Sequence, residues 1–326
     1  MPMTEGRVLF LYEHETSFVA TDLAILRERF DVATMDCSNG SSLRSVWRES
    51  MGADATFSWF ALGFAARAVL VGRLLRRPSV VVSGGWDVVD LPSIGYGAVR
   101  SPRGRRRARF VLRAATRVLA ISEWSRRTIH DVSGRNSELL YLGVDVERFH
   151  PHSGREDLVV TVGNVTQENL ARKGLETFVR AAAFLPEIPF VLVGEPFRDA
   201  ADSLRRIATP NVRLAGRVSD DLLRDLLARA KVYVQVSYNE GFGLALAEAM
   251  SSGCVPVVTR QGSLPEIAGD VGLYAPYGDA AATAILIREA LESGRSSAAR
   301  DRVLSLFPLA RRRERLQSIM QNLVSG

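Results

Sequence analysis

Two glutamates flank a glycine turn in the stretch YNEGFGLALAEAMSSGCVPVV, residues 238–258. Glu248 is the only polar side chain between Leu244 and Met250, which predicts a helix buried on every face. An unpaired buried carboxylate is costly, so Glu248 needs hydrogen-bond donors, and the two hydroxyls of a ribose would supply them. Glu240 lies on the turn itself, where a fixed carboxylate can contact sugar hydroxyls or a developing positive charge.

The turn between the glutamates has the properties of a phosphate site. Gly241 and Gly243 let a ligand approach the backbone closely, and Phe242 and Leu244 complete the entry into the helix. Backbone N–H groups at a helix start are unpaired and lie at the positive end of the helix dipole. The alternative interpretation needs no ligand: Glu248 is then a solvated helix residue and Glu240 a favourable charge at a helix start.

Short β-rich runs alternate with longer helical patterns, which is typical of βαβ units and parallel sheets. We expect six strands in each half of the chain: 7–12, 30–35, 54–60, 79–84, 117–122 and 137–142, then 157–163, 189–195, 211–216, 231–237, 255–259 and 271–276. The glycine turn follows the strand at 231–237. It therefore lies at the carboxyl edge of a sheet, where open α/β sheets bind their ligands.

The composition favours two cored α/β domains, because 326 residues are 47% hydrophobic and 24% charged. The polar stretch around Pro151 separates a first domain, 1–150, from a second, 151–308, and the final helix, 309–326, is expected to return to the first. The apolar segment 55–75 contains Arg67 and Arg73, so a strand and a buried helix are expected rather than a membrane span. The first residues lack a signal-peptide pattern, which favours a cytoplasmic protein.

No metal site is predicted. The two cysteines, Cys37 and Cys254, are far apart and lack CxxC spacing, and the four histidines have no spacing typical of ligands. Lysine is rare: the 42 basic residues include only Lys173 and Lys231.

Several motifs in order resemble the retaining glycosyltransferases of family 4. They are EGFGLALAE, AMSSGCVPVVT and GSLPEIAGDVGLYAP, preceded by GVDVERFHP and VGNVTQENLARKGLETFVRAA. The resemblance covers residues 117–280 well and the first 110 residues mainly by architecture. It implies the GT-B fold, an α/β fold in which two Rossmann-like parallel-sheet domains face each other across a cleft, the first for the acceptor and the second for the nucleotide sugar.

The resemblance also implies site roles. Glu240 contacts the donor sugar, residues 241–244 bind the sugar and phosphates, Glu248 binds the ribose, and Lys173 neutralises the diphosphate. The sequence departs from the family at Asn164, where an arginine is usual, and Arg172 is expected to replace that cation.

Two further site residues are left with open roles. Val218 either touches the nucleotide base or belongs to the core. Asp87, in GGWD just after a strand, either faces the reaction centre as a catalytic or acceptor-binding residue or organises a turn.

The predicted function is transfer of a sugar, in particular a hexose, from a nucleoside diphosphate to an acceptor hydroxyl with retention at the anomeric carbon. It serves glycan, glycolipid or glycosylated-metabolite synthesis. We expect no metal and no cofactor beyond the nucleotide-sugar co-substrate. The alternatives are a nucleotide-sugar epimerase and a non-catalytic nucleotide-sugar binder. A nicotinamide oxidoreductase is disfavoured because no GxGxxG follows the first strand.

Excess positive charge lies in the first half, with 21 arginines against 16 acidic residues. Six of these arginines fall within Arg103–Arg113, which suggests an anionic acceptor or peripheral contact with anionic lipids at the inner face of a membrane. A solvated helix face is the equal alternative. Nucleic-acid binding is not expected, since no recognised module accompanies the charge.

Overall fold

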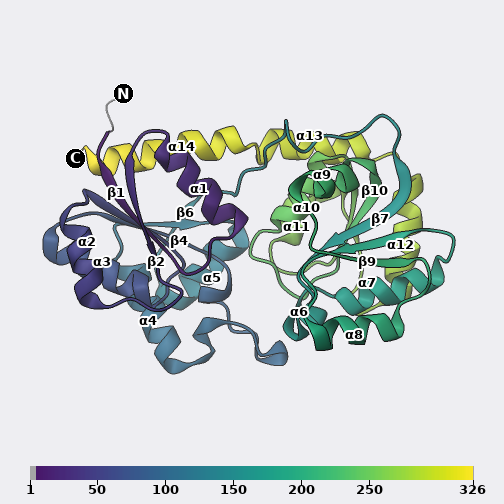
Figure 1. Cartoon of the computed structure of the whole chain (residues 1–326), viewed down its shortest axis with the longest axis horizontal. Coiled ribbons are helices and arrows are strands. Elements are labelled where there is room, and N and C mark those ends of the chain that lie inside the picture. Colours follow the sequence, from purple (N-terminus) through teal and green to yellow (C-terminus); the bar gives the residue numbers. More distant parts are fainter. Residues whose placement is uncertain (1–4, 326) are drawn as a thin grey trace. The chain divides into compact units, whose positions relative to one another are not determined.

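A computed structural model describes residues 5–325, and the chain divides into two compact units (Figure 1). The first unit comprises residues up to Leu142 together with those from Ala310 onward, and the second comprises Gly143–Leu309. The boundary therefore lies between Leu142 and Gly143, whereas the sequence analysis placed it after residue 150. The cause is that residues 143–152 pair within the second unit: Ser251 Oγ donates to the Phe149 carbonyl at 2.7 Å, and Val144 forms a bridge with Pro308.

The first unit contains a parallel sheet of order β2-β1-β3-β4-β5-β6. Its strands are β1 (Arg7–Tyr12), β2 (Asp31–Asp36), β3 (Ala55–Trp59), β4 (Ser79–Ser83), β5 (Arg117–Ala120) and β6 (Glu138–Leu139). Its α-helices are α1 (Ser17–Arg27), α2 (Leu43–Met51), α3 (Gly63–Leu75), α4 (Pro102–Ala114), α5 (Glu123–Ser133) and α14 (Leu309–Val324). Short 3₁₀ turns η1 (Trp86–Val88), η2 (Pro92–Ile94) and η3 (Ala98–Arg100) follow β4.

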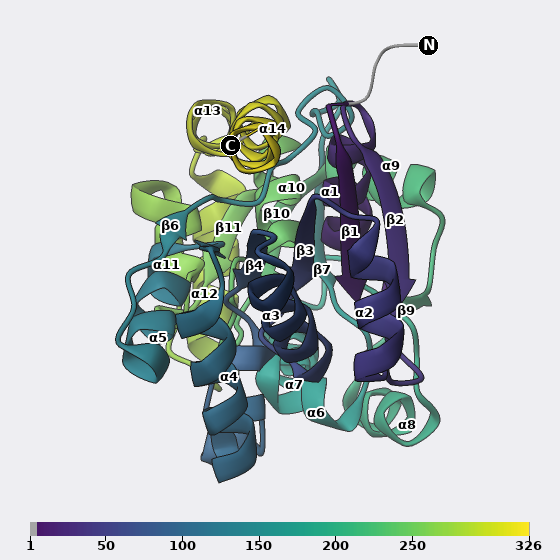
Figure 2. The same cartoon turned by 90° about the vertical axis from the view of Figure 1, so that its left-hand side faces the viewer.

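Helices cover both faces of this sheet. Helices α2, α3, α4 and α5 lie side by side on one face, and α1 and α14 lie on the other (Figures 1 and 2). The segment 55–75 forms the strand β3 and the helix α3, which buries one face against the sheet. This confirms the interpretation based on Arg67 and Arg73.

The second unit contains a parallel sheet of order β12-β11-β10-β7-β8-β9. Its strands are β7 (Glu156–Val162), β8 (Phe190–Val193), β9 (Val212–Gly216), β10 (Ala230–Gln235), β11 (Val255–Val258) and β12 (Leu273–Tyr274). Its helices are α6 (Gln167–Arg172), α7 (Leu175–Ala181), α8 (Arg198–Ile207), α9 (Asp220–Arg229), α10 (Leu244–Ser251), α11 (Leu264–Ala268), α12 (Ala280–Glu292) and α13 (Ser296–Leu306), with 3₁₀ turns η4 (Ala182–Phe184) and η5 (Gly269–Val271). This is the strand order of a Rossmann fold, in which all strands are parallel and the strand order reverses between β7 and β10.

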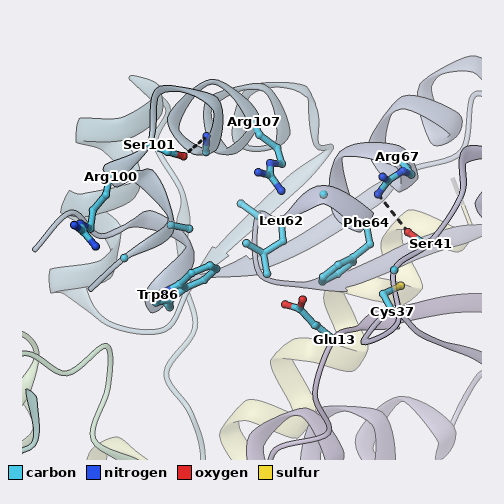
Figure 3. Close-up of a pocket in the computed structure, with 16 residues that line it drawn as sticks. Glu13, Cys37, Ser41, Leu62, Phe64, Arg67, Trp86, Arg100, Ser101 and Arg107 are labelled. Atoms are coloured by element: carbon cyan, nitrogen blue, oxygen red, sulfur yellow. Dashed lines mark hydrogen bonds between the residues drawn. The ribbon is translucent and has the colours of Figure 1, made fainter. Parts of the chain in front are cut away.

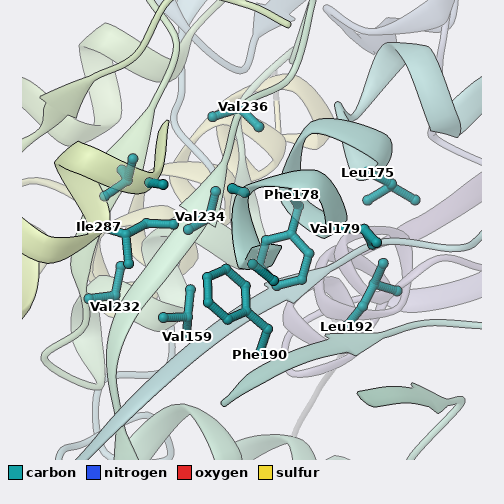
Figure 4. Packing of buried hydrophobic residues seen from close by; sticks show 14 of the residues in the cluster. Val159, Leu175, Phe178, Val179, Phe190, Leu192, Val232, Val234, Val236 and Ile287 are labelled. Atoms are coloured by element: carbon teal, nitrogen blue, oxygen red, sulfur yellow. The ribbon is translucent and has the colours of Figure 1, made fainter. Parts of the chain in front are cut away.

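The core of the second unit lies between this sheet and α7, α8 and α12. Phe178 of α7 and Phe190 of β8 pack with ring centroids 5.3 Å apart, among buried residues such as Val159, Val234 and Ile287 (Figure 4). Each buried aromatic or branched side chain contributes about 1.5–3 kcal/mol. This packing fixes the strand ends that carry the candidate site.

Candidate functional site

The candidate site lies at the carboxyl ends of β7 and β10. Lys173 follows α6 in the segment after β7, and Glu240 follows β10, so the reversal of the strand order brings together residues far apart in sequence. The Lys173 Nζ lies 3.1 Å from Glu240 Oε1. A guanidinium nitrogen of Arg172 lies 3.8 Å from the same oxygen, and Ser237 Oγ donates to it at 3.2 Å.

The Glu240 carboxylate is ionised. Burial alone would raise its pKa, but the positive charges of Lys173 and Arg172 outweigh this effect and leave the pKa below its usual value. The side chains of Glu240, Arg172 and Lys173 are 12%, 13% and 19% exposed, so the cluster is poorly screened by water and still open to a ligand.

Glycines let the lysine segment approach the sheet. Gly174 begins α7 with φ +66°, and a Cβ there would lie 2.2 Å from the Val236 carbonyl oxygen. A Cβ on Gly163 would lie 2.7 Å from Lys173 Cδ. Tyr277 donates its hydroxyl to the Ala171 carbonyl at 2.8 Å, and the Tyr238 N–H donates to the Arg172 carbonyl at 2.8 Å.

The glycine turn starts α10 as expected. Gly243 stands at the N-cap with φ +93°, a conformation that favours glycine, and offers no side-chain cap to the first N–H groups. The Ser263 hydroxyl donates to the carbonyls of Glu240 and Phe242 at 3.1 and 2.7 Å, which fixes the turn from the neighbouring loop. Phe242 is buried, and Gly241 and Gly243 have no side chain, so these three positions can offer a ligand only backbone groups.

Glu248 lies on α10, half-buried. Its surroundings within residues 5–325 supply no hydrogen bond to the carboxylate. Burial raises the pKa to about 8, Asp220 adds to the rise, and Arg148 opposes it. A carboxylate that is costly to ionise without partners is a position where hydroxyl donors from a ligand would be favourable.

Asn164 stands where the resemblance leads us to expect an arginine, and Arg172 was expected to replace that cation. Asn164 Oδ1 accepts the Glu195 N–H at 3.1 Å, so Asn164 holds the loop after β8. Arg172 donates to Asn169 Oδ1 at 2.7 Å and lies beside Glu240. Of the two residues, Arg172 is the one that brings positive charge to the cluster. Val218 is half-buried in the loop between β9 and α9, outside the buried core.

Asp87 is not part of this cluster. It lies in η1 of the first unit, fully buried, where Ser83 Oγ and the Ala61 N–H donate to Oδ2 at 2.6 and 2.9 Å. The N–H groups of Gly84 and Gly85 donate to Oδ1 at 3.3 and 3.1 Å. Burial raises its pKa and these hydrogen bonds oppose the rise. Both carboxylate oxygens of Asp87 therefore accept hydrogen bonds from neighbouring protein groups, as expected for a residue that organises a turn. We assign Asp87 no catalytic step.

The arginines of Arg103–Arg113 have several separate roles. Arg105 pairs with Asp90 at 3.1 Å, while Arg109 and Arg113 donate to the carbonyls of Val132 and Ser133 at the end of α5. Arg107 lines a cavity of the first unit, described below.

Sequence reasoning missed Ser237, Ser263 and the pair Tyr238 and Tyr277, which position the site. Ser237 and Tyr238 directly precede the glutamate motif, and Ser263 is the second residue of GSLPEIAGDVGLYAP, so their closeness to these motifs was a usable signal. Tyr277 carried no such signal, because its contact with the lysine segment depends on the fold.

Comparison with solved structures identifies the architecture. The Anabaena protein HepE, solved with UDP and glucose, superimposes with a TM-score of 0.82 over 97% of this chain and 100% of HepE, at 17% identity. Sucrose-phosphate synthase from Thermosynechococcus elongatus gives a TM-score of 0.80 over 98% of this chain and 99% of that chain, at 18% identity. The fold is therefore that of the GT-B glycosyltransferases.

Sequence comparison gives the family. Residues 156–293 match the family model described as Glycosyl transferases group 1. The MMP alpha-(1->4)-mannosyltransferase of Mycolicibacterium hassiacum is 30% identical over 222 residues, 65% of this chain and 52% of that protein. The O-antigen chain mannosyltransferase B of Escherichia coli is 42% identical over 81 residues, 25% of this chain and 21% of that protein.

The chain thus spans about half the length of the first of these relatives and about a fifth of the second. The residues that match the glycosyl transferases group 1 model, 156–293, include the lysine, both glutamates and the glycine turn of the second unit.

Proposed function

We propose that the chain transfers a sugar from a nucleoside diphosphate to an acceptor hydroxyl, with retention at the anomeric carbon. One observation carries this proposal: Lys173 and Arg172 converge on Glu240 at the point where the strand order of the second sheet reverses. The same point adjoins an uncapped helix start at Gly243. Two cations, a helix start without a side-chain cap and a fixed carboxylate suit a diphosphate joined to a sugar.

In the proposed reaction the donor diphosphate replaces Glu240 as the partner of Lys173 and Arg172. The bond between the anomeric carbon and the phosphate oxygen breaks, and negative charge grows on the diphosphate beside the two cations. Positive charge develops on the sugar, as in glycoside hydrolysis, and the ionised Glu240 stabilises it. The acceptor oxygen bonds to the same face of the carbon, and its proton passes to the leaving phosphate oxygen. Glu248 accepts hydrogen bonds from the ribose.

We also propose that this reaction needs neither a metal nor a cofactor, because the protein's own cations face the leaving group. Within residues 5–325, no three histidine, cysteine, aspartate or glutamate side chains are grouped as metal ligands. The donor screen below includes a chelator arm: unchanged transfer after treatment with EDTA supports the proposal, and loss that Mg²⁺ or Mn²⁺ restores contradicts it.

A donor screen tests the function. UDP- and GDP-hexoses are the first candidates, because HepE was solved with UDP and two relatives are named mannosyltransferases. Release of nucleoside diphosphate that depends on acceptor, with product of the donor's anomeric configuration, supports retaining transfer. Inversion contradicts retention. A new nucleotide sugar formed without acceptor supports an epimerase, and binding without turnover supports a non-catalytic binder.

We further propose peripheral contact with an anionic membrane through the α3–α4 surface, which we define as Leu70, Leu74, Phe110, Arg73, Arg106 and Arg113. Phe110 and Leu74 are 42% and 63% exposed, and Phe110 lies among Arg73, Arg106 and Arg113 around a shallow hollow. Exposed apolar side chains framed by arginines suit a lipid surface. No helix within residues 5–325 has the length and apolarity needed to span a bilayer.

Vesicle sedimentation tests this membrane contact. The chain should sediment with vesicles of phosphatidylglycerol and not with vesicles of phosphatidylcholine, and the double variant Leu74→Ser/Phe110→Ser should lose the binding. Leu222→Ser is the matched control, because Leu222 is 42% exposed in the second unit. Equal sedimentation of the double variant would exclude the α3–α4 surface as the contact.

A further inference from the structure

The first unit has its own cavity, of about 680 Å³, lined by residues of that unit (Figure 3). Its walls come from the segments after β1, β2, β3 and β4, including Glu13, Cys37, Leu62 and Trp86. The strand order reverses between β1 and β3, so the cavity stands at the reversal point of this sheet too. Ligands of open α/β sheets bind at such points.

Two guanidinium groups converge at one end of the cavity. Arg107 of α4 and Arg67 of α3 point toward each other over the start of α3 (Figure 3). Their terminal nitrogens lie 3.2 and 3.4 Å from the position that a Cβ on Gly63 would occupy. Gly63 leaves this space open, and a side chain there would meet both arginines.

Neither arginine is neutralised within residues 5–325. Arg67 donates only to Ser41 Oγ, at 3.4 Å, and neither guanidinium forms an ion pair with a described carboxylate. Arg105 on the same helix, by contrast, is paired with Asp90. Two like charges drawn together over apolar residues are unfavourable unless an anion lies between them.

The charge at this end favours a phosphoryl group. Two guanidinium forks match the geometry of phosphate oxygens, and a second positive group suits a dianion better than a monoanion. The start of α3 adds donors, because Leu62 at its N-cap provides no side-chain acceptor.

The other end of the cavity suits a hydroxylated ring. Trp86 is 44% exposed and lies beyond Leu62 from the arginines, and the Glu13 carboxylate points into the cavity below Leu62 (Figure 3). An aromatic face packs against the C–H face of a polyol, and a carboxylate accepts its hydroxyl hydrogen bonds.

We propose that this cavity binds the acceptor and that the acceptor carries a phosphoryl group. Arg67 and Arg107 hold the phosphoryl group, and Trp86 and Glu13 contact the hydroxylated part. The proposal rests on the proposed function, because it names the substrate class of the same transfer reaction.

Tryptophan fluorescence of the full chain tests the proposal with glucose 6-phosphate, inorganic phosphate and glucose as probes. Trp86 reports on the cavity, and Trp86→Phe assigns the signal to it. Glucose 6-phosphate should bind at least tenfold more tightly than glucose. The double variant Arg67→Gln/Arg107→Gln should weaken glucose 6-phosphate binding at least tenfold and leave glucose binding nearly unchanged.

Arg103→Gln is the control, because Arg103 is exposed on α4 and does not line the cavity. Glucose bound as tightly as its phosphate, or equal loss in the control and the double variant, overturns the proposal. Circular dichroism confirms that each variant is folded.

Two further measurements are needed. One distinguishes a soluble phosphorylated acceptor from a lipid headgroup, and the other distinguishes failure of the cavity proposal from failure of the proposed function. Saturable binding of glucose 6-phosphate supports a soluble acceptor. Binding confined to vesicles of phosphatidic acid, and lost in the double variant, supports a lipid headgroup. UDP affinity, measured by calorimetry, reports on the second unit. If the full chain binds UDP but does not prefer glucose 6-phosphate to glucose, the cavity proposal alone is overturned. Absence of transfer from every donor overturns the proposed function.

Discussion

Glu240 has two different partners in the proposed reaction: the cations of the protein before the donor binds, and the donor sugar afterwards. Its carboxylate lies 3.1 Å from Lys173 Nζ, and the two basic neighbours hold its pKa below the usual value. The residue therefore remains a fixed negative charge throughout the neutral pH range. A fixed charge stabilises a developing positive charge without reorganisation.

Replacing Glu240 by glutamine should separate catalysis from binding. We expect kcat to fall about 10²- to 10³-fold, because the amide keeps hydrogen bonds to hydroxyls and loses the charge. Affinity for the nucleoside diphosphate alone should not fall, since the carboxylate of residue 240 no longer competes with it for Lys173 and Arg172. Steady-state kinetics and calorimetry measure the two effects, with Glu292→Gln on the exposed end of α12 as control. Near-normal turnover of Glu240→Gln would remove its assigned role.

Glu248 makes the stability of the free protein depend on pH. Its folded pKa is raised to about 8, so the folded state retains a proton that the unfolded state has lost. The sign follows: stability falls as pH rises from the unfolded pKa of about 4.3 to about 8, and is constant above. Denaturation of Glu248→Gln should lack this component. An unchanged pH profile in the variant would contradict the raised pKa.

The same group should make donor binding pH-dependent. If ribose hydroxyls bind the ionised carboxylate, nucleoside diphosphate affinity rises by up to about tenfold per pH unit below pH 8 and is constant above. The phosphate itself titrates near pH 6, so the window from about 7 to 8 isolates Glu248. Calorimetry should show a flat profile there for Glu248→Gln.

At the scale of the elements, α7 and the end of β10 form the site by close backbone approach. Gly174→Ala should destabilise the second unit by more than the roughly 1–2 kcal/mol that a left-handed residue costs, because its Cβ would meet the Val236 carbonyl. It should also weaken nucleoside diphosphate binding by moving Lys173. Gly294→Ala is the control: Gly294 has φ +63° and open space around it. Equal losses in stability for the two variants would contradict the argument.

The sequence predicted a strand at each of the twelve positions, and the signal was strongest for runs such as SVVVS (β4) and VPVV (β11), which are β-branched and buried on both faces. It also predicted the turn after β10, because the spacing of Gly241 and Gly243 is typical of such a turn. The resemblance, rather than spacing, linked Lys173 with Glu240. Their contact depends on which strands are neighbours, and no local pattern carries that information.

The first unit was harder to predict. Whether Asp87 faces solvent or the protein depends on donors at Ser83 and Ala61, which only the fold brings near. Arg67 entered the prediction as an interruption of an apolar segment. Its signal was that interruption: an arginine near the start of an apolar helix needs a polar destination, here the cavity.

At the scale of the whole molecule, the last helix belongs to the first unit although it follows the second in sequence. Arg312 of α14 donates to Asp22 of α1 at 2.6 Å, with side chains 2% and 0% exposed, and the Trp59 indole donates to the same carboxylate at 3.1 Å. Removing one member of such a pair leaves a buried charge without its partner.

Arg312→Leu should therefore destabilise the first unit by about 3–5 kcal/mol, and Asp22→Leu/Arg312→Leu should recover much of the loss. Tryptophan fluorescence isolates this unit, because Trp47, Trp59, Trp86 and Trp124 all belong to it. Urea unfolding followed by fluorescence gives the measurement. A double variant no more stable than Arg312→Leu would contradict the pairing argument.

The central claim is that the second unit holds a nucleoside diphosphate through the cations beside Glu240, and the chain's two lysines test it directly. Lys231 on β10 is paired with Asp157 at 2.6 Å, outside the cluster, and is the matched control for Lys173. Calorimetry with UDP and GDP should show that Lys173→Ala weakens binding about tenfold to a hundredfold, the loss of one charge-assisted hydrogen bond. Lys231→Ala should bind as the unaltered protein does. Equal affinity of Lys173→Ala and the unaltered protein for both nucleotides would contradict the claim.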